Sequence, residues 1–407
     1  MADITLSDFQ KYLVPNYGTP PILIKKAKGV ELTGENGKKF IDLASGIAVS
    51  ALGHCNKDLV DALSKQSKKL WHVSNTLASE PSIKLAQELI KRTFAEQVFF
   101  ANSGAEANEA AIKLARRVSH NRFGSYKNEI ICFDGAFHGR TLLTVTAGSR
   151  ELYKKGFGPL PGGFKHIPFN EIETFKKTVS DSTCAVLVEP VQGEGGVIPI
   201  VPKFLLEIRN ACNQHNASLI IDEVQTGMGR TGSLFAYQGL EVVPDILTLA
   251  KSLGCGFPIS AMLTTNALSS HFSPGTHGST FGGNPLGCAV ANRAIELIDN
   301  QKFLENVKLR GDQLQNGLKK INQKYQVFSA IRGSGLLIGA VMNQSFKGKS
   351  ALIVKAGHKE GIIMLTAGDN VLRFAPPLLI SSKYMERALN KLERAIKLFV
   401  KTEKNSC

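Results

Sequence analysis

The chain has 407 residues, 43% of them hydrophobic and 20% charged, which is the composition of a globular protein long enough for two or more domains. Its formal net charge of +15 lies on amphipathic segments and not in clusters interleaved with aromatic residues, so no nucleic-acid partner is expected. No apolar run has the length of a membrane helix, and residues 1–8 lack the basic and apolar regions of a signal peptide, which predicts a cytoplasmic protein without a membrane partner. The cysteines and histidines lack the spacing of metal ligands, so no metal is expected.

The N-terminal residues 1–50 predict a small antiparallel unit. Two short apolar segments, 29–32 and 39–43, are separated by the turn sequence Gly34-Glu-Asn-Gly37, a pattern typical of a hairpin or meander. We expect this unit to pack with the C-terminal part of the chain.

Residues 51–300 alternate short apolar runs with longer helical patterns. The apolar runs are 97–101, 129–133, 184–189, 218–222 and 245–249. Continuous rather than alternating apolarity indicates strands that are covered on both faces, hence a mostly parallel sheet with crossover helices. This range therefore predicts a large, doubly wound α/β domain.

After about residue 300 the pattern changes to that of a smaller α+β domain, 301–407. A lysine-rich amphipathic helix is predicted over about 302–325, followed by a glycine-interrupted strand over 328–340. A strand near 371–374 and a closing helix over about 382–400 complete it. The predicted fold class is α/β with this second, smaller domain.

Two of the buried strands end in side chains with complementary chemistry. Lys251 follows the apolar run 244–250, and Asp222 ends the run 217–222. An amine can form an imine with an aldehyde cofactor, and a carboxylate can keep a basic ring nitrogen of that cofactor protonated. The pair points to pyridoxal 5'-phosphate, although a lysine after a strand is more often a solvated loop residue.

Further motifs offer a place for each part of such a cofactor. Ser103, Gly104 and Ala105 stand between a strand and an alanine-rich helix, so their backbone N–H groups predict a phosphate site, although a simple capped turn is about as common. Phe137 offers a flat face for a pyridine ring, and Arg140 a two-point grip for a carboxylate.

Four more features complete the set. Gln225 lies close enough in sequence to Asp222 to reach the ring's phenolic oxygen, and the segment 189–196 is rich in glycine without a nucleotide-binding pattern. A loop offers hydroxyl groups at Ser279 and Thr280, and Arg373 lies far downstream.

The order of these motifs resembles the class III aminotransferases of pyridoxal-phosphate fold type I, and the resemblance covers essentially the whole chain. It is carried by residues 51–55, 74–75, 137–140, 189–196, 222–225 and 276–280. Within that family the chain is most similar to the acetylornithine branch, whose members often also act on succinylornithine or succinyldiaminopimelate.

The resemblance implies a role for each matched position. Lys251 would be the Schiff-base lysine and proton carrier, Asp222 the partner of the ring nitrogen, Gln225 the contact of the phenolic oxygen and Phe137 the stacking residue.

The phosphate would be held by Ser103, Gly104 and Ala105, joined by Thr280 from the other subunit of a homodimer with active sites at its interface. Relatives commonly have Ser-Gly-Thr where this chain has Ser103-Gly104-Ala105. The missing hydroxyl removes one phosphate hydrogen bond, so we expect weaker cofactor affinity and unchanged chemistry.

The implied reaction moves the δ-amino group of N-acetyl-L-ornithine to 2-oxoglutarate by ping-pong kinetics, giving N-acetyl-L-glutamate 5-semialdehyde and L-glutamate in arginine biosynthesis. Arg140 would bind the carboxylate far from the cofactor, with Ser279 also in the substrate site. Arg373 would bind the near carboxylate of 2-oxoglutarate, and Glu194 would neutralise Arg373 when the amino donor is bound. Small polar residues at 74–75 favour an acylated substrate.

Alternatives remain open. Within the fold they are succinylornithine, succinyldiaminopimelate, ornithine and 4-aminobutyrate aminotransferases and glutamate-1-semialdehyde aminomutase. The aminomutase needs no external keto acid, so the pair of Glu194 and Arg373 counts against it. A basic nucleic-acid-binding protein predicts salt-sensitive binding and leaves the pair of Lys251 and Asp222 unexplained.

Overall fold

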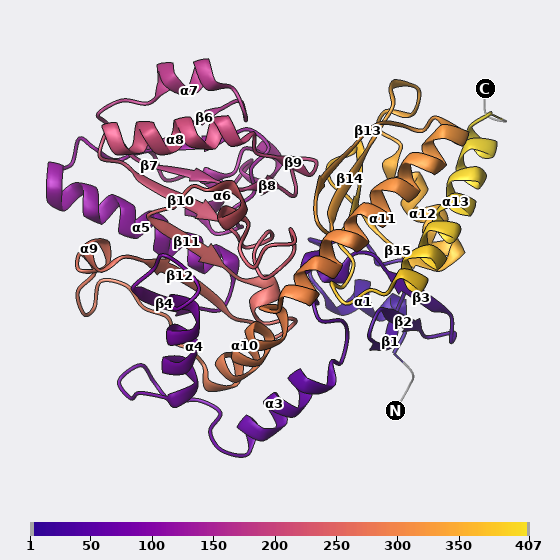
Figure 1. The fold of residues 1–407 in the computed structure, drawn as a ribbon, viewed down its shortest axis with the longest axis horizontal. Helices are drawn as coiled ribbons and strands as arrows, with labels where there is room; N and C mark the ends of the chain where they lie inside the picture. Colours follow the sequence, from indigo (N-terminus) through magenta and orange to yellow (C-terminus); the bar gives the residue numbers. More distant parts are fainter. Residues whose placement is uncertain (1–3, 405–407) are drawn as a thin grey trace.

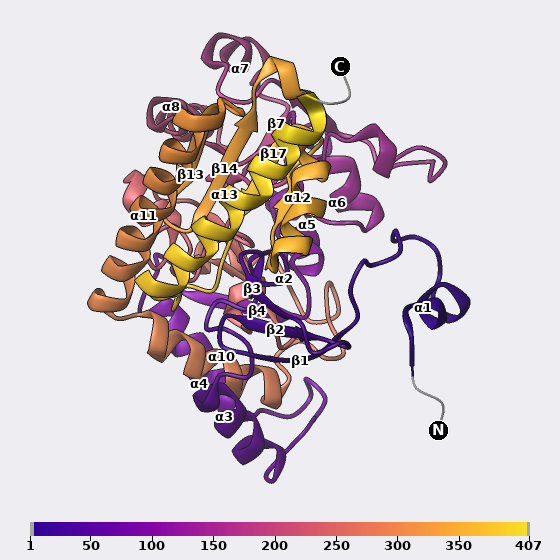
Figure 2. The same ribbon diagram turned by 90° about the vertical axis from the view of Figure 1, so that its right-hand side faces the viewer.

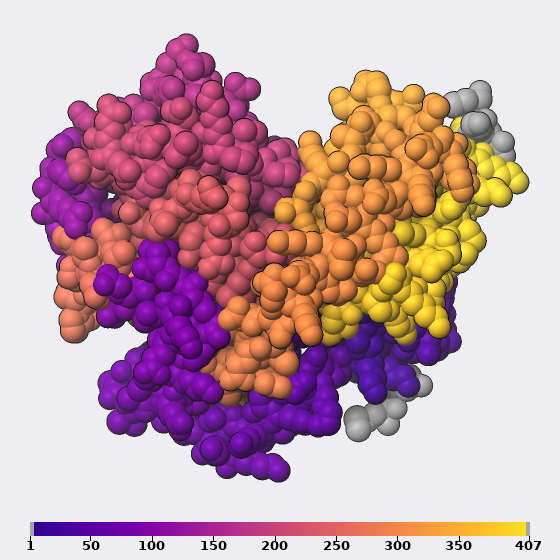
Figure 3. All heavy atoms as spheres, in the orientation of Figure 1, coloured from indigo at the N-terminus to yellow at the C-terminus, as the bar shows by residue number. Residues whose placement is uncertain are grey.

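The computed structural model describes residues 4–404, so the ends of the two predicted terminal units, 1–3 and 405–407, lie outside the described part. The chain forms two lobes that meet along one side, with both termini on the lobe at the right of Figure 1. Figure 3 shows a notch between the lobes at the top of the same view. None of the helices within residues 4–404 has the length and apolarity needed to cross a membrane.

The larger lobe is built on a seven-stranded sheet with the order β4-β12-β11-β10-β7-β5-β6. Its strands are β4 (Gln97–Ala101), β5 (Glu129–Phe133), β6 (Phe164–Ile167), β7 (Thr183–Val188), β10 (Ser218–Asp222), β11 (Ile246–Leu249) and β12 (Ser260–Thr264). Only the two pairings made by β12 are antiparallel. The predicted mostly parallel sheet is therefore confirmed.

Helices cover both faces of this sheet, which explains the continuously apolar strands. Alternate residues of a strand point to opposite faces. In β10, Ile220 packs in a cluster with the alanine-rich helix α5 (Gly104–Phe123), whereas Leu219 and Ile221 pack in the cluster that contains α8 (Pro202–Gln214). The other helices of the lobe are α3 (Lys57–Ser67), α4 (Glu80–Ile90), α6 (Leu142–Ala147), α7 (Ile172–Thr178), α9 (Asn266–Ser269) and α10 (Pro285–Ile298). The short helix α2 (Ser45–Ala48) lies between the lobes, since Ala48 packs with residues of both.

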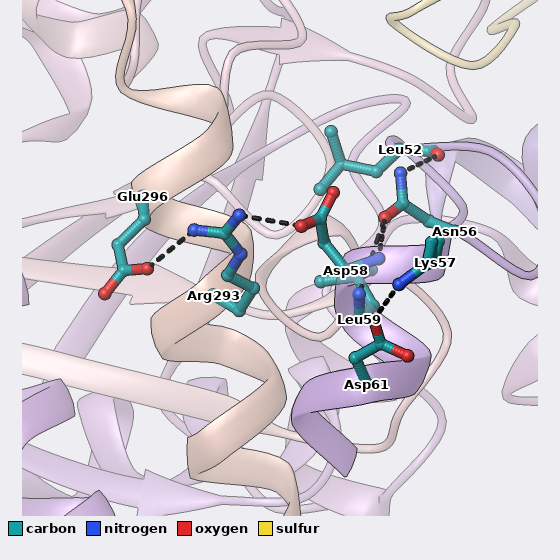
Figure 4. Close-up of polar contacts among 8 residues, drawn as sticks. All are labelled: Leu52, Asn56, Lys57, Asp58, Leu59, Asp61, Arg293 and Glu296. Atoms are coloured by element: carbon teal, nitrogen blue, oxygen red, sulfur yellow. Dashed lines mark hydrogen bonds and ion pairs between the residues drawn. The ribbon is translucent and has the colours of Figure 1, made fainter. Parts of the chain in front are cut away.

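The start of α3 is fixed to α10 by polar contacts (Figure 4). Asn56 caps α3 by accepting the N–H of Asp58 at 3.0 Å, and its own amide donates to the carbonyl of Leu52 at 3.1 Å. Arg293 of α10 bonds Asp58 at 2.8 Å and Glu296 at 3.1 Å. These bonds hold the segment before α3 against the body of the lobe.

The N-terminal strands form the predicted meander and gain a fourth strand from the other end of the chain. The sheet has the order β1-β2-β3-β15. Its strands are β1 (Ile24–Lys28), β2 (Glu31–Gly34), β3 (Lys39–Asp42) and β15 (Ile362–Ile363). Ile41 pairs with Ile362 in parallel register, so the N-terminal unit lies beside the C-terminal part. The domain boundaries at residues 50 and 300 remain a prediction.

The second lobe also contains an antiparallel sheet with the order β13-β14-β17-β16, and Figure 2 shows it behind the helices α12 and α13. Its strands are β13 (Phe328–Ser334), β14 (Leu337–Met342), β16 (Leu365–Thr366) and β17 (Val371–Phe374). The helices are α11 (Gln301–Tyr325), α12 (Ser350–Glu360) and α13 (Ser382–Lys404). Helix α1 (Leu6–Tyr12) precedes β1 in the chain.

The prediction of one glycine-interrupted strand over 328–340 is wrong, because the chain reverses there as a hairpin. Ser334 pairs with Leu337, and Gly335 between them has a φ of 54°, a left-handed conformation that favours glycine. A Cβ on Gly335 would also lie 2.6 Å from the carbonyl oxygen of Arg230. The turn therefore depends on a glycine that allows close approach to the larger lobe.

Candidate active site

A cavity of about 400 Å³ lies beyond the carboxyl ends of β10 and β11. This is the edge at which parallel sheets bind ligands. Its wall brings together most of the residues predicted to hold the cofactor, which are Ser103, Gly104, Ala105, Phe137, Asp222, Gln225 and Lys251, with Arg140, which is predicted to bind the substrate. Residues far apart in the sequence thus share one cavity.

Asp222 ends β10 with its carboxylate buried and held by three N–H donors. One oxygen accepts from the Nδ2 of Asn108 and the Nδ1 of His138, both at 2.8 Å, and the other accepts the backbone N–H of Val224 at 2.9 Å. Asn108 is itself fixed, because its oxygen accepts the hydroxyl of Thr248 at 2.8 Å. The carboxylate is therefore oriented before any ligand binds.

Lys251 follows β11 after a single residue and has a φ of 44°, an uncommon backbone conformation for a residue other than glycine. Burial lowers the pKa of its amine, and the nearby guanidinium of Arg373 adds to this effect against the opposing charges of Glu194 and Asp222. A lowered pKa leaves more of the amine neutral, which is the form that attacks a carbonyl carbon.

The turn before α5 presents backbone N–H donors at a helix N-terminus. Ser103 caps the helix, its hydroxyl accepting the N–H of Glu106 at 3.3 Å while the carboxylate of Glu106 accepts the N–H of Ser103 at 2.7 Å. The N–H groups of Gly104 and Ala105, at the first two helical positions, have no partner within the helix and carry its positive dipole end. They face a cavity that can take a phosphate.

Gly104→Ala is expected to weaken binding of pyridoxal 5'-phosphate about tenfold, because forced overpacking of this kind costs on the order of 1–3 kcal/mol. The added Cβ would lie 2.7 Å from the Cγ1 of Val224, so the turn must shift. Absorbance titration of the protein with the cofactor measures the affinity. Gly162→Ala is the control, since its Cβ meets nothing within 4 Å; equal affinities of the two variants would contradict the prediction.

Phe137 and Arg140 also line the cavity. Phe137 is half-buried, and its N–H donates to a carboxylate oxygen of Glu189 at 3.1 Å. Arg140 is exposed, with its guanidinium carbon 3.6 Å from the ring centre of Tyr153 and 5.6 Å from that of Phe137. The ring of Phe137 and the guanidinium of Arg140, which has no ion pair among residues 4–404, are thus adjacent.

Arg373 forms an ion pair with Glu194. Arg373 lies on β17, in the sheet of the smaller lobe, and its side chain is 4% exposed, whereas that of Glu194 is 21% exposed. Both charges act on the pKa of Lys251. The arrangement neutralises one arginine near Lys251 and leaves the other, Arg140, without an ion pair in the described part of the chain.

Ser279 and Thr280 lie outside this cavity. Ser279 accepts the amide of Asn102 at 3.1 Å through its hydroxyl and that of Asn75 at 2.7 Å through its carbonyl, and it lines a neighbouring hollow. Thr280 is exposed. The structure of one chain therefore does not bring these hydroxyl groups to the cofactor residues.

Sequence reasoning missed three buried residues of the site: Asn108, His138 and Glu189. Burial, with the charge of Asp222 close by, raises the pKa of Glu189 well above its usual range. Because Glu189 follows β7, the strand next to β10, the rule that strand ends share one edge could have found it. The bonds of Asn108 and His138 to Asp222 have no comparable signal in the sequence.

Comparisons with known proteins identify the family of the chain. The family model described as aminotransferase class-III matches residues 12–396. A curated relative from Shewanella oneidensis, named acetylornithine aminotransferase, is 51% identical over 390 residues, 96% of either chain. A relative from Pseudomonas aeruginosa, named succinylornithine transaminase/acetylornithine aminotransferase, is 48% identical over 98% of either chain. The crystal structure of N-acetylornithine aminotransferase from Stenotrophomonas maltophilia K279a matches with a TM-score of 0.86 and 40% identity, over 98% of this chain and 100% of that one.

Proposed function

The chain belongs to the class III aminotransferases, and we propose that it moves the δ-amino group of N-acetyl-L-ornithine to 2-oxoglutarate. The products would be N-acetyl-L-glutamate 5-semialdehyde and L-glutamate, the chemistry of an arginine-biosynthetic step. The names of relatives that match nearly the whole chain support this substrate. Its cytoplasmic location remains a prediction.

The observation that carries the proposal is the convergence of Lys251, Asp222 and the free N–H groups of the α5 turn on one cavity. Pyridoxal 5'-phosphate, the cofactor of this family, supplies an aldehyde and an electron-accepting ring when bound. Lys251 would hold the aldehyde carbon and return to carry the proton, and Asp222 would face the ring nitrogen. Gln225 lines the same cavity, and the N–H of its side-chain amide would donate to the phenolic oxygen.

The two arginines explain how one site would accept two differently charged substrates. N-acetyl-L-ornithine has a single carboxylate, far from the reacting amine, which Arg140 would bind. 2-Oxoglutarate has a second carboxylate beside its keto group, which would displace Glu194 from Arg373. While the amino donor is bound, the ion pair of Glu194 and Arg373 keeps an unpaired positive charge away from the reacting nitrogen.

We further propose a homodimer in which Thr280 of each chain contributes to the phosphate site of the other. Its support is an apolar surface around the hollow beside Ser279, where Leu77, Ile83 and Phe281 are all more than half exposed. Exposed apolar patches of this kind mark interaction sites. Sedimentation velocity of the purified protein tests it, and a monomer at micromolar concentration would contradict it.

The substrate proposal is tested by the rate of amino transfer to 2-oxoglutarate from four donors: N-acetyl-L-ornithine, L-ornithine, N-succinyl-L-ornithine and N-succinyl-L,L-diaminopimelate. We expect the highest kcat/KM with N-acetyl-L-ornithine. A higher value with L-ornithine would contradict the proposal. A higher value with a succinylated donor would select the second candidate, which the name of the Pseudomonas aeruginosa relative favours.

Glu194→Gln is expected to lower kcat/KM for N-acetyl-L-ornithine about tenfold, because Gln cannot neutralise Arg373 and a hydrogen bond to a charged group is worth roughly 1.5–3 kcal/mol. The half-reaction with 2-oxoglutarate, in which Glu194 leaves Arg373, should change less than about threefold. Stopped-flow absorbance measures the two half-reactions separately.

Glu151→Gln, at an exposed glutamate of the same lobe, is the control for the Glu194 variant. An unchanged preference between the two half-reactions in Glu194→Gln would remove the support for the proposed switch.

A further inference from the structure

Arg140, which would bind the distal carboxylate of both substrates, is held by an aromatic ring and by no carboxylate in the described part of the chain. Its guanidinium carbon lies 3.6 Å from the ring centre of Tyr153, which is face-on contact between a cation and a ring. A free arginine side chain would lose up to about 2 kcal/mol of rotamer freedom when it grips a ligand. Stacking on Tyr153 restricts that freedom before the ligand arrives.

Tyr153 is itself fixed on two sides. Its ring packs edge-on against Phe137, with centres 6.2 Å apart and planes at 87°. Its hydroxyl accepts a hydrogen bond from the Nη1 of Arg150 at 3.1 Å. The ring of Tyr153, on which Arg140 stacks, is therefore held in place by Arg150 and by Phe137, the residue that is proposed to stack on the cofactor.

Arg150 connects this support to the proposed switch. Its Nη2 donates to the backbone carbonyl of Glu194 at 2.8 Å, while the side chain of Glu194 pairs with Arg373. Since the backbone of Glu194 is held, its carboxylate can leave Arg373 by side-chain rotation alone. The same guanidinium thus fixes both Tyr153 and the backbone of Glu194.

We propose that Tyr153, held by Arg150, is a specificity-determining positioning residue that sets the affinity for the substrate carboxylate by fixing Arg140. This inference rests on the proposed binding of a distal carboxylate by Arg140. Tyr153 would act through Arg140, because Arg140 lines the cavity with Lys251 and Tyr153 does not. We therefore expect loss of the Tyr153 ring to raise KM for donors that carry the carboxylate and to leave kcat largely unchanged.

The test compares donors with and without the α-carboxylate on the holoenzyme: N-acetyl-L-ornithine against N-acetyl-1,4-diaminobutane, and L-ornithine against 1,4-diaminobutane. In Tyr153→Leu we expect KM for the carboxylate donor to rise about tenfold, from loss of the stacked ring, with kcat within about threefold of wild type. KM for the donor without the carboxylate should change less than about twofold. An equal rise for both members of a pair would overturn the proposal.

Tyr153→Phe keeps the ring and loses only the hydrogen bond to Arg150, so a smaller rise of about threefold is expected. The control is Phe157→Leu, an exposed aromatic residue of the same segment, which should leave both values of KM unchanged. A Tyr153→Phe variant as impaired as Tyr153→Leu would show that the ring does not support Arg140.

A double-mutant cycle tests whether Tyr153 acts through Arg140. In an Arg140→Gln background, Tyr153→Leu should add less than about twofold to KM for the carboxylate donor. Additive effects would overturn the proposal. Failure of the proposed function can be told apart from failure of this inference. If the wild-type enzyme prefers L-ornithine, the proposed substrate is wrong, and the pair of L-ornithine and 1,4-diaminobutane then tests the role of Tyr153.

Discussion

Lys251→Ala is expected to lower amino transfer about ten-thousandfold, the upper range for loss of a positioned proton-transfer group, because the same side chain also provides the covalent attachment. Alanine has neither the nucleophile nor the proton carrier, and water cannot replace an amine at the centre of this cavity. The rate with the preferred donor and 2-oxoglutarate measures the loss. Borohydride reduction followed by mass spectrometry of peptides should locate the cofactor on Lys251 in wild type and nowhere in the variant.

Lys251→Arg is the matched control, because it keeps the positive charge and most of the length. An arginine stays protonated and does not act as a nucleophile here. It should be as inactive as the alanine variant, which separates the nucleophile from the charge. Turnover by either variant within about tenfold of wild type would remove Lys251 from the chemistry.

Asp222→Asn is expected to lower the rate roughly a hundredfold to a thousandfold, since loss of one member of a buried charge pair costs about 3–5 kcal/mol. The asparagine has no charge to keep a ring nitrogen protonated. Its amide hydrogens would also face the donors Asn108 and His138, which now bond the carboxylate at 2.8 Å. Single-turnover kinetics in both directions measures the effect.

Glu223→Gln is the control for the Asp222 variant. Glu223 is the next residue, equally buried, but its oxygens accept the N–H groups of Ala236 and Tyr237 at 2.7 Å and do not line the cavity. This change should affect the unfolding temperature and leave the cofactor spectrum unaltered. An Asp222→Asn variant that differs from wild type no more than Glu223→Gln does would contradict the assigned role.

The sequence predicts this fold wherever local pattern decides the structure. Continuous apolarity located the central strands, and the 3.6-residue spacing located α11, predicted over about 302–325 and found at Gln301–Tyr325. The hairpin at Gly335 was missed although Ser334-Gly335 is a local turn signal, because a glycine inside a strand pattern also fits a bulge. The closeness of Gly335 to Arg230, which lies far away in the sequence, had no local signal.

The same distinction holds for the site. Lys251 and Asp222 were found because a polar residue after a buried strand is visible in the sequence, and the sheet brings such ends together. The donor Asn108 lies near the start of α5 and the donor His138 in a loop, and nothing local indicates that both face Asp222. The contact of Tyr153 with Arg140 is likewise a result of packing alone.

The pairing of β3 with β15 has a consequence for how the polypeptide matures on the ribosome. Ile41 leaves the exit tunnel long before its partner Ile362 has been made. The seven-stranded sheet, complete by Thr264, is free to form while the first strands still lack their neighbour. Arg373 follows shortly after Ile362, so we expect ligand-binding competence to arise only after β15 has been made and has joined β3.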